Sequence, residues 1–173
     1  MKLFYALVLT FSLSSCLFAK GGVDIATLIK PSFSKGVSVS KKQFKLSSKE
    51  VKTLQNMAKA SIKSNTIRLY TVKKGSTVQG YAVLLLQTVR SKKTAVLYVI
   101  GKNQKIKNIE IVAFNEPREY KPKENWLSSF DNKGRQDNLF SGKGIPTISG
   151  ATLSARAVSD LARVALAVVA KYK

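Results

Sequence analysis

The sequence contains no histidine and a single cysteine, Cys16. The absence of histidine excludes a Ser-His-Asp triad, a histidine general base and haem attachment through a C-x-x-C-H motif. A single cysteine excludes an intrachain disulfide, and together with the lack of histidine it excludes a Cys/His zinc site. The chain therefore lacks the residues on which most common hydrolytic enzymes depend.

Acidic residues are also scarce. Asp and Glu total 9 against 30 Lys and Arg, which gives a net charge of +21. A charge of this size raises the question of nucleic acid, but the lysines are scattered in pairs, and we find no Arg-rich helix, aromatic RNA-binding signature or zinc finger. We therefore expect no nucleic acid as a partner. We expect a solvated basic surface that attracts anionic partners, such as an acidic electron-transfer protein or anionic lipid.

Residues 1–19 have the features of a signal peptide. Lys2 precedes an apolar stretch, residues 3–13, which is short for a membrane helix and is followed by small polar residues. No later apolar run is long enough to span a bilayer. We therefore expect an exported protein.

Two cleavage sites compete at the end of this segment. Residues 13–16 fit a bacterial lipobox, which would leave a lipidated Cys16 as the new N-terminus, whereas residues 17–19 fit ordinary signal peptidase, which would cut before Lys20. Apolar residues follow Cys16 where a lipoprotein usually has a polar tether, and this favours the ordinary site. Either cut places the protein in the periplasm or on the outer face of the cytoplasmic membrane.

The rest of the chain predicts an α+β fold. Residues 20–65 form a lead-in segment, irregular or partly extended up to 46, followed by a helix over about 48–63 that opens with a capping box of Ser47 and Glu50. Runs of β-branched and aromatic residues separated by short breaks then predict antiparallel strands. These runs are 66–72, 78–89, 94–100 and 105–114.

The C-terminal third ends in a second amphipathic helix. Residues 115–146 are rich in polar residues, proline and glycine, and predict loops with a short helix near 124–130. A helix over about 152–171 follows, with an apolar stripe expected to be buried. We expect an antiparallel sheet with an N-terminal helix and this C-terminal helix packed on it. The stripe contains Leu153, Leu161, Val164 and Val168.

The segment 148–154 joins a glycine turn to the start of this helix and presents several hydroxyl groups. The free N–H groups and the dipole of a helix N-terminus favour a phosphate. The alternative is that Ser149 or Thr152 merely caps the helix, as most hydroxyls before helices do. The residues by themselves favour the cap.

Ser149-Gly150-Ala151-Thr152, with Ser154 two residues later, resembles the flavinylation motif of the FMN-binding domain family. That family includes the C subunit of the sodium-pumping NADH:quinone reductase, the G subunit of Rnf complexes and the regulator of nitrous-oxide reduction. The resemblance covers about residues 66–172, and we take 66–173 as the domain. Upstream segments follow in the family's order, namely 80–83, 105–109, 114–117 and 126–130.

The resemblance implies an exported electron-transfer protein with FMN joined to Thr152 by a phosphoester bond. A separate magnesium-dependent flavin transferase would deliver the FMN from FAD and release AMP. Ser149, Gly150, Ala151 and Ser154 would surround the attachment site. The chain departs from the family at Pro146, where an aspartate is common, so FMN bound without a covalent bond also stays open.

Other residues are weaker candidates for the site. Trp126, Phe130, Tyr81 and Phe114 would flank the flavin ring, although core packing explains each of them at least as well. Lys143 would pair with the phosphate or the reduced flavin, if it is not simply solvated. We expect surface charge pairing for Glu116 and Asp137.

The sequence shows no second cofactor motif and no substrate site, so we expect an electron-carrier domain and not a complete enzyme. Such a domain needs periplasmic or membrane electron-transfer partners on both sides. The competing hypothesis is a basic binding module without a cofactor, which docks on anionic lipid or an acidic protein.

Overall fold

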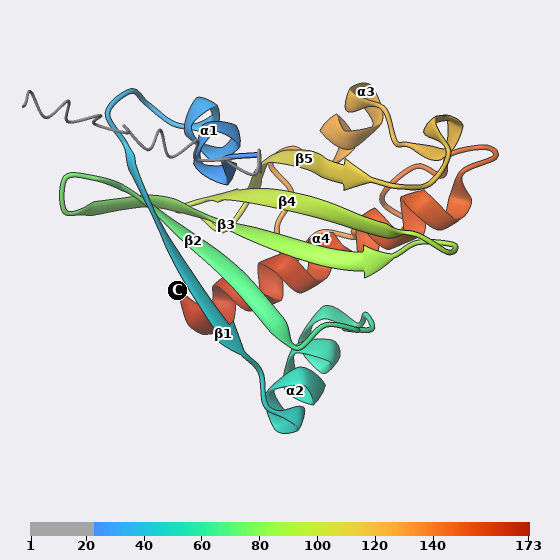
Figure 1. Ribbon diagram of the computed structural model, residues 1–173, viewed down its shortest axis with the longest axis horizontal. Helices are drawn as coiled ribbons and strands as arrows, with labels where there is room; N and C mark the ends of the chain where they lie inside the picture. Colours follow the sequence, from blue (N-terminus) through green and yellow to red (C-terminus); the bar gives the residue numbers. More distant parts are fainter. Residues whose placement is uncertain (1–22) are drawn as a thin grey trace, which may run out of the picture.

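The structure, a computed structural model, describes residues 23–173. The expected signal peptide, with both of its cleavage sites, lies outside the described residues. Between 23 and 173 no helix is long and apolar enough to cross a membrane. Figure 1 shows one sheet with a long helix on one face and short helical segments around it.

The centre of the fold is a five-stranded antiparallel sheet in which neighbours in sequence are neighbours in space. This confirms the expected α+β class with an antiparallel sheet. The register is continuous from strand to strand, apart from bulges in the third and fifth strands. The strands are β1 (Ser38–Lys45), β2 (Thr66–Lys74), β3 (Thr77–Thr88), β4 (Lys93–Gly101) and β5 (Ile106–Phe114).

The first strand comes from the lead-in segment and adds an edge that the sequence analysis did not assign to the sheet. β1 runs antiparallel to β2, from Ser38 opposite Lys73 to Lys45 opposite Thr66. Most of its side chains are exposed. Backbone hydrogen bonds to the neighbouring strand can hold an edge strand that has no apolar face. The mainly polar sequence of β1 therefore did not predict a strand.

Helix α4 (Thr152–Tyr172) packs across one face of the sheet and buries most of its length. The hydroxyl of Tyr98, at the centre of β4, donates a hydrogen bond of 2.8 Å to the carbonyl of Val158 in this helix. Burial raises the pKa of Tyr98 well above its ordinary value, so the hydroxyl stays a donor. The expected burial is confirmed for Leu161, Val164 and Val168.

The expectation was wrong for Leu153, whose side chain is 48% exposed. Leu153 stands in the first turn of α4, next to the exposed Thr152. Burial begins directly after it, at Ser154 and Ala155, so Leu153 is the one residue of the expected stripe that lies at the surface.

Helix α2 (Ser48–Ala58) begins with the predicted capping box: the Ser47 hydroxyl accepts from the backbone of Glu50, and the Glu50 carboxylate accepts from the backbone of Ser47. The helix ends earlier than expected, because Lys59 adopts a left-handed conformation at φ +48°. It packs against α4. Glu50 also accepts a 2.9 Å hydrogen bond from the hydroxyl of Tyr172 near the end of α4.

The opposite face of the sheet carries α1 (Ile25–Ile29) and the 3-10 turn η1 (Lys30–Ser32) (Figure 1). Phe33 follows η1 and packs against Gly80, where a Cβ atom would come within 2.7 Å of the aromatic ring. Together these residues cover a second apolar cluster on the sheet, which includes Ile29, Val72 and Leu97.

The connection between β5 and α4 is mostly irregular, as expected. It contains η2 (Arg118–Tyr120), α3 (Glu124–Leu127) and η3 (Ser128–Phe130), and the last two account for the short helix predicted near 124–130. In Figure 1 this connection returns the chain to the end of the sheet where β3 turns into β4 and where α4 begins.

Candidate functional site

The start of α4 has no side-chain cap within residues 23–173. Gly150 adopts φ +76°, a left-handed conformation that suits glycine. The N-cap residue is Ala151, whose methyl group cannot accept a hydrogen bond, and no side chain caps the helix. Neither Ser149 nor Thr152 therefore acts as the plain cap that the residues by themselves favoured. The N–H groups of the first turn have no acceptor within the helix, and they point out of its N-terminal end.

A small cavity of about 160 Å³ opens at this helix start. It brings together four residues of the sequence motif with two residues from distant parts of the chain. Thr152 is exposed and Ser154 is buried. The lining consists of Gly150, Ala151, Thr152, Leu153 and Ser154, together with Arg90 and Tyr120.

Arg90 comes from the turn between β3 and β4, and this turn is fixed by Glu116. One carboxylate oxygen of Glu116, Oε1, accepts 2.7 Å hydrogen bonds from the backbone N–H groups of both Ser91 and Lys92. These two hydrogen bonds hold the pKa of Glu116 below its ordinary value, and the bond from Lys92 has the larger effect. Glu116 was expected to pair with surface charges. Instead it is buried and binds backbone, because a turn at this position leaves two N–H groups without strand partners.

Arg90 is further positioned by an aromatic ring. Its guanidinium carbon lies 4.7 Å from the centre of the Tyr120 ring, a distance typical of a cation–π contact. The stack places a permanent positive charge beside the uncapped first turn of α4. Both features favour a phosphate group at Thr152.

Two larger hollows adjoin the first one through Arg90. One, of about 770 Å³, is lined by Arg90, Lys92, Asn115, Pro117 and Tyr120 among others. The other, of about 270 Å³, lies along α4 and includes Leu153 and Arg156. All three hollows share Arg90 as a lining residue, and the residues present fit FMN.

Trp126, a candidate to flank the flavin ring, lines none of the three hollows that share Arg90. Its indole Nε1 donates a 2.9 Å hydrogen bond to the carbonyl of Pro146, and its ring meets Phe130 edge-on at 5.4 Å between centroids. Trp126 therefore holds the backbone just before the motif, at the residue where the chain departs from the family pattern. Phe130 is fully buried in the core.

The remaining candidates line none of the three hollows around Arg90. Ser149 is exposed in the turn itself. Tyr81 packs against the main core from β3, and Phe114 stands opposite Thr94 at the end of β5. Lys143 lines a separate cavity beside the middle of α4. Asp137 accepts a 2.7 Å hydrogen bond from the backbone of Gly134, so it too binds backbone.

Sequence reasoning missed Arg90 and Tyr120. Arg90 stands in a stretch that reads only as a polar turn, and Tyr120 in a proline-rich loop. They approach Thr152 only through the pairing of β4 with both neighbours and through the bond from Glu116 back to the turn. No local pattern encodes those distant contacts.

Residues 90–167 match the family model of the FMN-binding domain. This segment is therefore similar to the FMN-binding domain family. The match runs from Arg90 into α4 and includes every residue that lines the cavity at Thr152. It confirms the suspected family and supports FMN as the cofactor of this domain. No curated protein and no solved structure matches the chain.

A metal-based alternative finds no support in the part of the chain that the structure describes. No group of three Asp, Glu, His or Cys side chains there is placed to hold a metal ion.

Proposed function

We propose that this protein is an exported electron carrier whose FMN is attached through a phosphoester bond to Thr152. The observation that carries the proposal is the position of Thr152, exposed at the uncapped start of α4 and in the same cavity as Arg90. Bound FMN would accept and donate one or two electrons. A covalent bond would prevent its loss outside the cytoplasm.

The attachment reaction needs an acceptor hydroxyl that another protein can reach. The Thr152 oxygen would attack the FMN-side phosphorus of FAD, the bond to AMP would break, and the threonine proton would pass to a base of the flavin transferase. A threonine hydroxyl is a weak nucleophile, so the transferase and its magnesium must supply the activation. Gly150 and Ala151 are small residues before the acceptor and leave room for that enzyme.

The chain's own residues would then hold the cofactor. The first-turn N–H groups of α4 and the guanidinium of Arg90 would bind the phosphate, and Tyr120 would fix the direction of Arg90. The groove along Lys92, Asn115 and Pro117 has room for the ring. Leu153, exposed at the cavity, would cover part of the ring's apolar surface.

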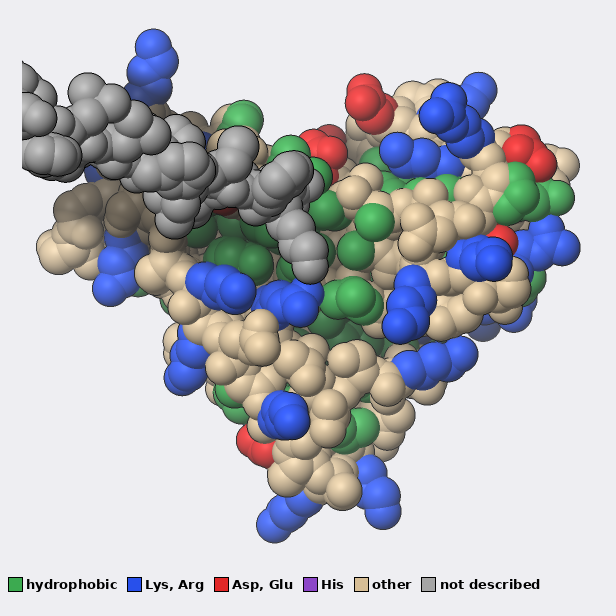
Figure 2. Space-filling view, in the orientation of Figure 1, with side chains coloured by type: hydrophobic (Ala, Val, Ile, Leu, Met, Phe, Trp, Pro, Cys, Tyr) green, Lys and Arg blue, Asp and Glu red, His purple; other side chains and the backbone are tan. Residues whose placement is uncertain are grey.

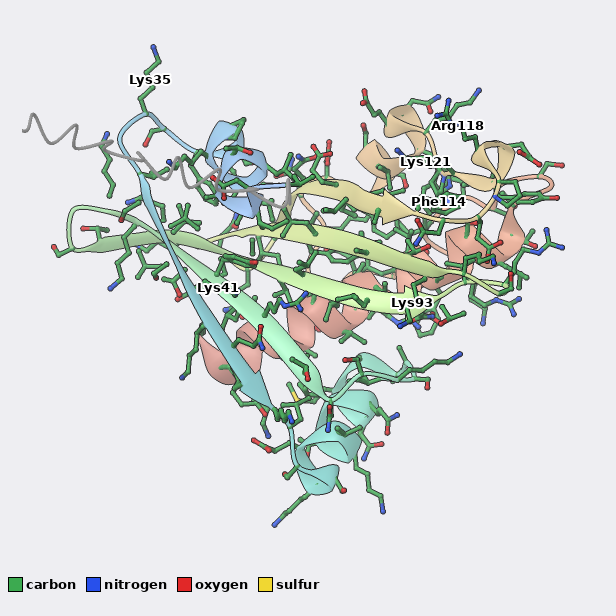
Figure 3. All side chains as sticks on the ribbon, in the orientation of Figure 1. Lys35, Lys41, Lys93, Phe114, Arg118 and Lys121 are labelled. Atoms are coloured by element: carbon green, nitrogen blue, oxygen red, sulfur yellow. The ribbon has the colours of Figure 1, made fainter. Side chains whose placement is uncertain are left out.

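The basic surface around this site suggests the kind of electron-transfer partner. Arg118 and Lys121 lie in the connection after β5 (Figure 3), on either side of Tyr120, whose ring contacts Arg90. Figure 2 shows Lys and Arg spread over the sheet face with few acidic side chains among them. We propose an acidic periplasmic or membrane redox protein as the partner, with anionic lipid as a second surface for the same charge. A lipid anchor at Cys16 or cleavage before Lys20 would bring the protein to that location.

Absorbance of the exported protein tests this proposal. Material purified from a host that contains an active flavin transferase should be yellow, and the colour should stay with the protein after denaturation. If native protein is yellow but loses the flavin on denaturation, FMN is bound without a covalent bond. In that case a Pro146→Asp variant, which restores the family's aspartate, should become covalently modified. Protein that is colourless in all these forms would be the cofactor-free binding module.

A further inference from the structure

A second cavity, of about 420 Å³, lies between the end of α2, the middle of α4 and the loop 135–143. It shares no lining residue with the three hollows around Arg90. Arg163, which contributes to its wall, lies about 16 Å further along α4 than Thr152 at 1.5 Å of rise per residue. The cavity is therefore separate from the proposed flavin phosphate site.

Arg163 gives this cavity a rigid wall. Its side chain is 10% exposed, and its guanidinium lies 3.8 Å from the centre of the Phe140 ring. Its N–H groups are all used within the protein, so Arg163 has no donor left for a ligand. The acceptors are the carbonyls of Ala58, Lys59, Leu139 and Ser159 and the carboxylate of Asp160.

The loop that forms the other wall is also held in one shape. The carbonyl of Phe140 accepts hydrogen bonds from the N–H groups of Lys143, Gly144 and Ile145. A Cβ atom at Gly144 would collide with the carbonyl of Asn138, so the two stretches of backbone touch. A ligand in this cavity would therefore meet an arrangement that needs little reorganisation.

The lining combines positive charge with apolar surface. Lys59, Arg135 and Lys143 contribute cations, and within residues 23–173 none of them forms an ion pair. The acid among the lining residues, Asp137, has one carboxylate oxygen bound to the backbone of Gly134. The apolar contribution comes from Met57, Leu139, Phe140 and Leu166.

We propose that this cavity binds a small organic anion, a carboxylate carried on an apolar body about the size of one ring. The carboxylate would meet Lys59, Arg135 and Lys143, which line the cavity from the end of α2 and from the loop 135–143, while Phe140 and the aliphatic side chains contact the body. Inorganic phosphate would satisfy the cations but leave the apolar lining bare, and a neutral ring would leave the cations without a counter-charge. This site does not depend on the flavin.

Titration with benzoate, followed by ¹⁵N NMR of the full mature chain, tests the proposal. We expect saturable shifts centred on the amides of residues 138–143, in wild-type protein and equally in Thr152→Val, which lacks the proposed attachment site. Benzyl alcohol and inorganic phosphate serve as the neutral and the purely ionic comparison. Both should bind more weakly than benzoate.

The variants replace exposed cationic residues of the cavity, because such replacements should leave the fold intact. Lys143→Met and Arg135→Gln should each weaken benzoate about fivefold. Lys93→Met, at the start of β4 (Figure 3), is the matched control and should leave the affinity unchanged. The proposal fails if phosphate or benzyl alcohol binds as tightly as benzoate, if the shifts do not saturate, or if Lys93→Met weakens binding as much as Lys143→Met.

Discussion

The guanidinium of Arg90 lies 4.7 Å from the centre of the Tyr120 ring, beside the first turn of α4. The two residues reach this position from a hairpin turn and from a loop after the last strand. Their contact directs a positive charge toward the helix start that carries Thr152. The combination distinguishes this helix N-terminus from an ordinary one.

Replacing Arg90 with Gln should weaken the binding of free FMN to Thr152→Val protein about tenfold, since a charged contact to the phosphate is lost. Fluorescence quenching of FMN on titration with protein measures this. Lys93→Gln, which removes a charge from the same hairpin without lining the cavity, should have little effect. Equal losses in both variants would mean that only the overall charge matters.

Replacing Glu116 with Ala should loosen the turn that presents Arg90, since two backbone N–H groups lose their acceptor. Thermal unfolding should occur at lower temperature at neutral pH than in wild type, and FMN should bind more weakly. Glu119→Ala, which changes an exposed neighbour, is the matched control. Unchanged FMN binding in Glu116→Ala would show that the turn does not need this carboxylate.

The same carboxylate predicts a pH dependence. The pKa of Glu116 is below its ordinary value of 4.5 in the folded protein, so the ionised form favours folding. Its contribution is fully present above pH 4.5 and is lost as the pH falls through the lowered folded pKa. The stability of wild type should therefore fall more steeply than that of Glu116→Ala over this acidic range. Parallel curves from denaturant titrations would contradict this assignment.

Replacing Arg163 with Ala should destabilise the fold by at least about 2 kcal/mol, because several partly buried carbonyls lose their donor at a cost of about 1–3 kcal/mol each. Arg156→Ala removes an exposed arginine from the same helix and should change the stability by less than about 0.5 kcal/mol. Urea unfolding measures both. If the two variants lose similar amounts of unfolding free energy, Arg163 does not stabilise the contact between α2, α4 and the loop at Leu139.

In α4 the side chain of Leu161 is buried, whereas that of Leu153 is exposed. Leu161→Ala should cost about 2–5 kcal/mol, as large-to-small changes in a core do, since Leu161 is 5% exposed. Leu153→Ala should stay within about 0.5 kcal/mol. If Leu153→Ala costs as much as Leu161→Ala, the first turn of α4 is packed more tightly than the structure shows.

Local patterns in the sequence predicted the elements well because each has a local cause. The capping box at Ser47 sets the start of α2, and the runs of β-branched residues set four strands. β1 was missed because its pairing with β2, and not its own composition, makes it a strand. The early end of α2 was missed because it depends on the left-handed Lys59, whose carbonyl binds the distant Arg163.

The candidate site likewise contains residues that the sequence predicted and residues that it did not. Gly150, Ala151, Thr152 and Ser154 are contiguous, so the motif alone placed them together. Arg90 joins them only after β4 has paired with both neighbours and the carboxylate of Glu116 has closed the turn. The polar-turn sequence around Arg90 carries no sign of these distant contacts.

The central claim is that Thr152 carries FMN, and intact mass spectrometry of denatured protein tests it most directly. Wild-type protein and Thr152→Val should be coexpressed with an active flavin transferase and purified from the exported fraction. The account predicts that wild type gains the mass of one FMN joined with loss of water, that Thr152→Ser keeps part of this gain, and that Thr152→Val shows none, since a methyl group cannot form a phosphoester. A Thr152→Val protein that still carries the added mass would contradict the account.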